Sequence, residues 1–279
     1  MKISNNAVKP YDSKPVYDSQ CDPAQTKPVR TSGQSPRVNV DVCEVKPSAL
    51  PPAVSKAKAQ ILKTARANTN NVEGIEETRK KLAPNIRIMS DYFKSIKDSG
   101  AVTGDQEKEL TAGNWRSRWF DDKEVGDVGP LKLNRERVWQ IVNPIETGEK
   151  ESYYYNAFEY KAKAGGFEFG KARGFLRGKY SFSESNPPKT GSATNIDLEF
   201  TYNGIRPFGF KAGSNIEKLV DKVENSNFAS VPVPGPIGIK GKLRNLYIDK
   251  DIRISEGIQL DKSDPSRRDL YILERGATV

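Results

Sequence analysis

Alternation of hydrophobic and polar residues is clearest between positions 243 and 254. Three isoleucines there fall on one side of an extended chain, opposite a set of aromatic and charged residues: Ile248, Ile252 and Ile254 against Tyr247, Asp249, Asp251 and Arg253. This period of two is typical of a strand with two different faces. Residues 270–275 repeat it, and 255–269 contains Gly257, Pro265 and many charges. We therefore expect two strands joined by a hairpin loop, with both aspartates and the arginine on one face.

The same period begins at Gly113, where Trp115 and Trp119 alternate with arginines. Five further runs are strand-like and are separated by short loops of glycine, proline, asparagine and serine: 137–143, 153–160, 166–169, 173–182 and 196–202. Many short strands at near-regular spacing favour an antiparallel barrel or sandwich. A capping box at 214–217 begins an apolar stripe and predicts one helix inserted between strands. The proline-rich run 231–239 predicts an edge strand or a rim loop.

The residues before position 113 have a different pattern. Residues 53–112 repeat apolar positions every three or four residues, as helices do: Val54, Ala57, Ile61, Leu62 and Ala65, then Ile86, Met89, Phe93 and Ile96 after Pro84. Residues 1–52 are rich in proline, serine, asparagine and lysine and have no sustained period. We expect a disordered tail or targeting segment at 1–52, a helical extension at 53–112 and a β domain at 113–279.

Composition excludes several kinds of function. The chain has no histidine, which removes the usual general base and imidazole metal ligand and excludes Ser–His and Cys–His nucleophiles. Both cysteines, Cys21 and Cys43, lie in the tail, so the β domain needs no disulfide. No apolar run approaches the ~18 residues of a membrane span, so any membrane contact is expected to be peripheral. The net charge of +9 is dispersed and selects neither nucleic acid nor anionic lipid. We expect no catalytic residue, cofactor or metal site.

The end of the chain resembles a known family. The sequence Leu-Tyr-Ile-Asp-Lys-Asp-Ile-Arg-Ile at 246–254, followed by Asp-Leu-Tyr-Ile-Leu-Glu-Arg at 269–275, is similar to the closing signature of the plastid lipid-associated proteins, or fibrillins. Gly113-Asn114-Trp115 resembles the Gly-x-Trp opening of that family and of lipocalins. The runs 138–141 and 155–159 also resemble a pair of its strands. The resemblance implies a lipocalin-like barrel that binds or carries a lipid, isoprenoid or quinone.

The same resemblance implies peripheral association with plastid membranes, at the thylakoid or plastoglobule, or with their cyanobacterial equivalent. Trp115 would be structural and close one end of the barrel. Aromatic residues would line the cavity, and three charged side chains would orient a headgroup: Trp119, Tyr155, Phe158, Phe200, Tyr202 and Tyr247, with Asp249, Asp251 and Arg253.

Three other functions remain open from the residues alone. Cations alternate with aromatics in the run 173–182, a pattern that suits single-stranded nucleic acid, although dispersed charge makes this a weaker expectation. Asp249 and Asp251, two residues apart on one strand, could form the acid–base pair of a hydrolase, but Arg253 beside them would keep both ionised. The tail could also direct secretion of a bacterial effector. We expect a non-enzymatic carrier rather than these alternatives.

Overall fold

The computed structural model describes most of the chain after the tail. The described ranges are 50–69, 74–121, 127–128, 131–164, 167–183, 195–207, 231–232, 237–259 and 268–276. Nearly all of the predicted tail at 1–52 lies outside them, as does the predicted helix beginning at 214.

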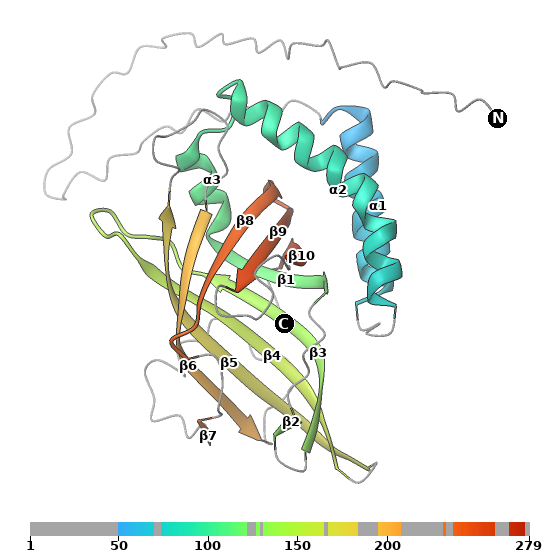
Figure 1. Ribbon diagram of the computed structural model, residues 1–279, viewed down its shortest axis with the longest axis vertical. Coiled ribbons are helices and arrows are strands. Elements are labelled where there is room, and N and C mark those ends of the chain that lie inside the picture. The colour runs from blue at the N-terminus through green and yellow to red at the C-terminus, as the bar shows by residue number, and fades with distance from the viewer. Residues whose placement is uncertain are drawn as a thin grey trace, which may run out of the picture. The chain divides into compact units, whose positions relative to one another are not determined.

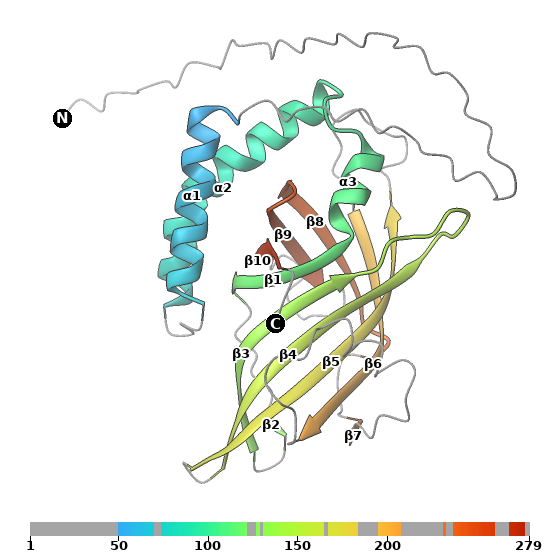
Figure 2. The ribbon, with the colours of Figure 1, turned by 180° about the vertical axis from the view of Figure 1, so that it is seen from behind.

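Eight antiparallel strands of the described chain close into a barrel (Figures 1 and 2). They are β1 Gly113–Phe120, β3 Leu131–Val142, β4 Ser152–Ala164, β5 Phe167–Ser183, β6 Asn195–Pro207, β8 Lys240–Ile248, β9 Ile252–Gln259 and β10 Asp269–Arg275. Their order is β1-β10-β9-β8-β6-β5-β4-β3, and pairing of β1 with β3 closes the ring. Two short strands, β2 Asp127–Val128 and β7 Val231–Pro232, pair with β3 and β6. The prediction of a mainly β, antiparallel barrel is confirmed.

Several strands are longer than predicted, and in two places the number of strands differs from the prediction. Residues 167–169 and 173–182 belong to one strand, β5, which pairs with β4 from Phe167 to Tyr180. The expected strand at 243–254 is a hairpin, in which β8 ends at Ile248 and β9 begins at Ile252. Asp249 makes this turn, because its Oδ1 accepts hydrogen bonds from the backbone N–H of Asp251 (2.7 Å) and Ile252 (2.9 Å). The strand β9 then continues to Gln259, into the region predicted to be a loop.

The strands differ in length, and this shapes the two ends of the barrel. Strands β3, β4, β5 and β6 contain 12, 13, 17 and 13 residues, whereas β1, β8, β9 and β10 contain 8, 9, 8 and 7. The longer strands therefore project beyond the shorter ones at the end away from α3 (Figures 1 and 2). The inner face of the barrel continues there as the face of an open, curved sheet.

Three helices precede the barrel: α1 Pro52–Ala67, α2 Ile75–Asp98 and α3 Gly104–Thr111. The predicted apolar positions of α1 and α2 are mostly buried: Val54, Ala57, Ile61, Ala65, Ile86, Met89 and Phe93. The Phe93 ring meets the Tyr247 ring edge-on, with centroids 5.7 Å apart. Arg66 of α1 also binds Glu274 of β10. The two long helices thus cover the outer face of β8, β9 and β10. No described helix is long and apolar enough to cross a membrane.

Strand register separates the inner face from the outer face, because directly paired residues point to the same side of a sheet. Tyr247 pairs with Ile254, Ile254 with Ile272, and Ile272 with Trp119, so this row faces outward under the helices. The opposite row faces inward, and its members are described with the site below.

Trp115 is buried and lies against the short helix α3 at one end of the barrel. The indole Nε1 donates a hydrogen bond to the Thr111 carbonyl oxygen (2.9 Å), and the Arg275 guanidinium lies 4.2 Å from the Trp115 ring centroid. Arg275 also donates to three backbone carbonyl oxygens, those of Leu110, Ala112 and Lys250. These contacts stabilise the junction between the helices and the barrel.

Candidate ligand-binding site

Arg253 is the most unusual residue inside the barrel, because a charged side chain there has no exposed surface. Its Nε donates to Asn245 Oδ1 (2.8 Å), and its Nη1 lies 3.5 Å from Gln140 Oε1. Its Nη2 is buried and has no hydrogen-bond partner among the described residues. Burial lowers the pKa of Arg253 to about 10. The guanidinium is therefore still charged at neutral pH, although its buried Nη2 lacks a hydrogen-bond acceptor.

A buried polar chain connects Arg253 to the helices. Asn245 Nδ2 donates to Glu107 Oε1 (3.1 Å) and to Thr111 Oγ1 (3.1 Å). The other oxygen of Glu107 accepts from Lys97, and both of these side chains are buried. Glu107 is thus already neutralised by Lys97. The chain from Lys97 to Arg253 contains two positive charges and one negative charge, a local excess of +1.

Two tyrosines face the same interior. Tyr154 donates a hydrogen bond to Asn156 Oδ1 (2.9 Å), and Tyr180 donates to the Asn143 carbonyl oxygen. Burial raises the pKa of both phenols, that of Tyr180 to about 12, although the positive charge of Arg253 opposes the shift. Both phenols are therefore neutral at pH 7, and neither supplies a negative charge for Arg253.

Two buried serines on the inner face also lack partners. Neither Ser117 Oγ nor Ser255 Oγ makes a hydrogen bond in the described part of the chain. Ser117 pairs with Leu273, which pairs with Arg253, so Ser117 and Arg253 share the inner face. Ser255 lies two residues beyond Arg253 on the same side of β9, roughly 7 Å away along the strand. Three unsatisfied polar groups therefore line one wall, where buried polar groups are normally hydrogen-bonded.

A small cavity of about 40 Å³ lies farther along the inner face, beside Gly257, which is two residues beyond Ser255 on β9. It is lined by Tyr154, Asn156, Leu198, Phe200, Gly241, Lys242, Leu243, Gly257, Asp269 and Tyr271. Gly257 keeps it open, since a Cβ at that position would be 3.0 Å from Leu243 Cδ2 and 3.1 Å from Tyr271 Cε2. One water molecule occupies roughly 30 Å³ in the liquid. The cavity can therefore hold a water molecule or a small polar group.

The inner face becomes more apolar toward the projecting ends of the long strands. Phe158 and Tyr160 of β4 are half-buried, and their rings stack with centroids 5.8 Å apart. Phe158 pairs across the sheet with Val138 on one side and Gly174 on the other. Aromatic surface is thus continuous with the interior and partly open to solvent.

No protein-family model, curated protein or solved structure matches this chain.

The predicted ligand-binding residues are divided between the two faces of the barrel. Phe158, Phe200 and Arg253 are on the inner face. Four aromatics are on the outer face: Trp119 and Tyr247 in the row under the helices, and Tyr155 and Tyr202, which pair with Arg177. A register shift between Ser117 and Trp119 turns Trp119 outward, so the expected shared face of Trp115 and Trp119 was wrong.

The expectation that Asp249, Asp251 and Arg253 share one strand face was also wrong. Both aspartates lie in the β8–β9 turn and bind the same ammonium group, Lys58 Nζ, at 2.7 and 2.8 Å. Burial alone would raise the pKa of Asp249, but hydrogen bonds from Lys58 and from two backbone N–H groups lower it below its usual value. Asp249 is therefore unsuited to act as a general acid, and the geometry does not form the acid–base pair considered from the sequence.

The cations of β5 are likewise used within the protein. The Arg177 guanidinium lies 5.6 Å from the Tyr153 ring centroid and 5.7 Å from that of Tyr202. Lys179 binds Glu151 across the strand pair. The alternation of cations and aromatics in this strand is thus accounted for by contacts on the outer face of the sheet, and no described feature adds support for nucleic-acid binding.

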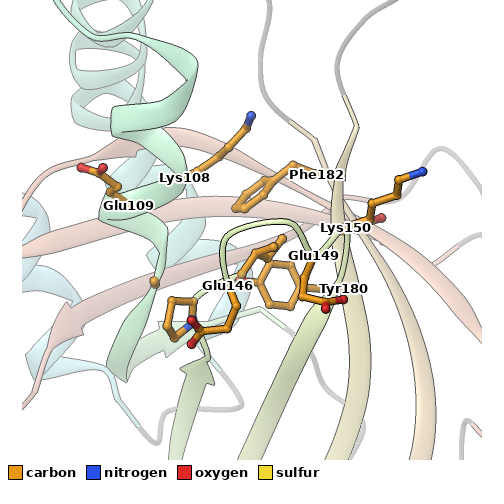
Figure 3. Close-up of a pocket in the computed structure, with 11 residues that line it drawn as sticks. Lys108, Glu109, Glu146, Glu149, Lys150, Tyr180 and Phe182 are labelled. Carbon is orange, nitrogen blue, oxygen red and sulfur yellow. The ribbon is translucent and has the colours of Figure 1, made fainter.

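A second, larger hollow of about 650 Å³ lies at the α3 end. Its walls come from α3, the β3–β4 hairpin and the end of β5 (Figure 3). Phe182 extends between α3 and the hairpin, with Lys108 Nζ 6.0 Å from its ring centroid (Figure 3). Three glutamates and two lysines line the hollow: Glu109, Glu146, Glu149, Lys108 and Lys150. Tyr180 lines this hollow as well as the interior. The mixed charges define no ligand.

Sequence reasoning missed Gln140 and Asn245, which bind Arg253, and Glu107, which binds Asn245. A weak signal for two of them exists, because Gln140 interrupts the apolar run Val138–Val142 and Asn245 lies between Leu243 and Tyr247. Among the described residues, no group of three or more acidic or cysteine side chains could hold a metal ion.

Proposed function

We propose that this protein is a member of the plastid lipid-associated protein family and that its barrel binds a small hydrophobic ligand, a lipid, isoprenoid or quinone, without catalysing a reaction. The observation that carries this proposal is the set of unsatisfied polar groups on an enclosed wall: Arg253 Nη2, Ser117 Oγ and Ser255 Oγ. A folded interior normally leaves few such groups without partners. A bound ligand with a polar head would satisfy them.

The form of the barrel suits such a ligand. Closed barrels of about eight strands can enclose one small molecule, and ligand sites are mostly apolar with a few polar groups that orient the guest. Here the polar wall is at the closed end. Apolar side chains such as Leu198 and Phe200 follow it, and the aromatic pair Phe158 and Tyr160 lies beyond them.

The size of the cavity constrains how a ligand enters. A space of about 40 Å³ admits a polar head but not an alkyl chain. The chain must therefore extend toward Phe158 and Tyr160 and displace the side chains of the intervening layer, of which Phe200 and Tyr271 line the cavity. We expect binding to be slow compared with diffusion, because it requires this rearrangement.

The cellular setting in this proposal is the surface of a plastid or cyanobacterial membrane. Its support is the sequence resemblance. The carrier would meet that surface peripherally and take up or release its ligand there.

The test is equilibrium binding of oleyl alcohol, geranylgeraniol and decylplastoquinone to the purified full-length chain, measured by displacement of a polarity-sensitive fluorescent probe. We expect at least one to bind with a Kd in about the micromolar range. The variant Gly257→Val, which fills the cavity, should weaken binding, whereas Glu199→Val on the exposed outer face of β6 should not. Failure of all three compounds to bind the correctly folded protein would overturn the proposal.

A further inference from the structure

Resting on the proposed function, we infer that the ligand is a carboxylate amphiphile, such as a long-chain fatty acid, whose headgroup binds Arg253 at the closed end of the barrel. The first support is charge. Lys97 and Glu107 form an ion pair, which leaves the Arg253 guanidinium with no carboxylate partner in the described protein. A buried charge is costly unless it is paired, and a ligand anion would pair it.

The second support is the direction of the hydrogen bonds. Arg253 Nη2 can only donate, and the serine hydroxyls on the same wall can also donate. Tyr154 and Tyr180 already donate to Asn156 and to the Asn143 carbonyl oxygen, so neither provides an anion. Arg253 Nη2 is thus a buried donor that has no acceptor in the described part of the chain. A carboxylate supplies acceptors only, and its two oxygens can bind a guanidinium through charge-assisted hydrogen bonds.

The third support is the match between one excess positive charge and one negative charge. A dianionic phosphate monoester would leave a negative charge uncompensated in a water-poor interior. A neutral alcohol or quinone would accept a hydrogen bond but would leave the Arg253 charge unpaired.

The position of Arg253 in the barrel determines the direction in which the rest of the ligand extends. Beyond the polar wall come Leu198, Phe200 and Leu243, with Asn156 and Asp269 beside them, and then Phe158 on the inner face of the projecting strands. An alkyl chain that extends from a carboxylate at Arg253 would therefore follow apolar side chains toward the open end. The opposite orientation would place the carboxylate among aromatics and leave Arg253 unpaired.

The experiment compares oleate, oleyl alcohol and dodecyl phosphate on the wild-type chain, on Arg253→Met and on the matched control Arg244→Met. Arg244 lies on the exposed part of β8 and binds Glu256. We expect the wild type to bind oleate about ten- to hundredfold more tightly than oleyl alcohol, which is the usual effect of a hydrogen bond to a charged group. Arg253→Met should remove this preference and leave the affinity for oleyl alcohol nearly unchanged. Arg244→Met should retain the preference.

A second measurement needs no variant. With carboxyl-labelled ¹³C oleate on the wild type, the bound carboxylate should remain ionised at a pH well below that at which free oleate protonates, because the guanidinium stabilises its charge. Equal affinity for oleate and the alcohol, tighter binding of the phosphate, or an unshifted carboxyl titration would each overturn this inference while leaving the carrier proposal intact. If none of the ligands binds, the carrier proposal itself fails.

Discussion

Replacing Arg253 with methionine should make the ligand-free protein more stable. Burial lowers the pKa of Arg253 well below its ordinary value, to about 10, and each pKa unit is worth about 1.4 kcal/mol. Holding the charge inside the barrel therefore costs about 3 kcal/mol at neutral pH. The substitution also leaves Asn245 Oδ1 without its donor, which costs about 1 to 2 kcal/mol. We expect a net gain of about 1 to 2 kcal/mol in the free energy of unfolding.

The sign of this effect also fixes its pH dependence. Because the folded-state pKa is below that of the unfolded chain, the cost is fully present below about pH 10 and disappears as pH rises toward the ordinary pKa of arginine. Urea unfolding at pH 7 in the absence of lipid measures the gain as a higher midpoint at an unchanged slope. The control is Arg275→Met, which loses three hydrogen bonds and the contact with Trp115 and should destabilise the protein by about 2 to 4 kcal/mol. A loss of stability in Arg253→Met comparable to that of the control would show that Arg253 is a structural residue.

Two further predictions concern the contacts between helices and barrel. Lys58→Met should cost about 1 to 2 kcal/mol at pH 7 by releasing Asp249 and Asp251. Because the pKa of Asp249 is lowered, the wild type should lose this stability as pH falls below about 4. Urea unfolding at several pH values measures the loss. If Lys58→Met shows the same acid dependence as the wild type, the assignment is contradicted. Glu107→Ala should lower the free energy of unfolding by about 3 to 5 kcal/mol, because it leaves Lys97 buried and unpaired. Adding Lys97→Met to this variant should recover much of that stability. If the losses of the two single variants simply add in the double variant, the pairing is refuted.

The class of fold could be predicted because its signal is repeated along the chain. Period-two runs from Gly113 onward, short polar connections and the Gly-x-Trp opening all agree with an antiparallel barrel. A sequence specifies one fold when its independent local signals agree in this way. The helical stripe at Val54, Ala57 and Ile61 was equally clear, since one face of a helix repeats over several turns. These features depend on many residues at once, so an exception at one position does not change the predicted fold.

Boundaries depended on few residues and were less well predicted. Gly170, Lys171 and Ala172 look like a break in β5, yet they pair with Ala162, Lys161 and Tyr160 of β4. Backbone hydrogen bonds with a neighbouring strand hold them extended, whatever their side chains prefer. Such tertiary support cannot be seen in the local sequence.

The β8–β9 hairpin shows why the site could not be located from alternation alone. The run Tyr247, Asp249, Asp251, Arg253 has a period of two, but a turn at 249–251 reverses the chain inside it. An aspartate that caps its own turn gives the same spacing as a strand residue, and the Asp-Lys-Asp sequence was the available turn signal. Across the turn, Tyr247 faces the helices while Arg253 faces the interior.

Alternation also cannot say which of two mixed faces is enclosed. Charged residues normally point to water, and alternation grouped Arg253 with the two aspartates as three side chains that would orient a headgroup. The structure instead encloses Arg253 with Gln140 and Asn245, and it leaves the outer face of the same strands to isoleucines, Tyr247 and two helices. The α1–α2 pair reverses the usual polarity of this part of the sheet by providing apolar cover outside. A barrel whose outer wall is buried can keep a polar interior, and that exchange is the physical basis for the ligand site proposed around Arg253.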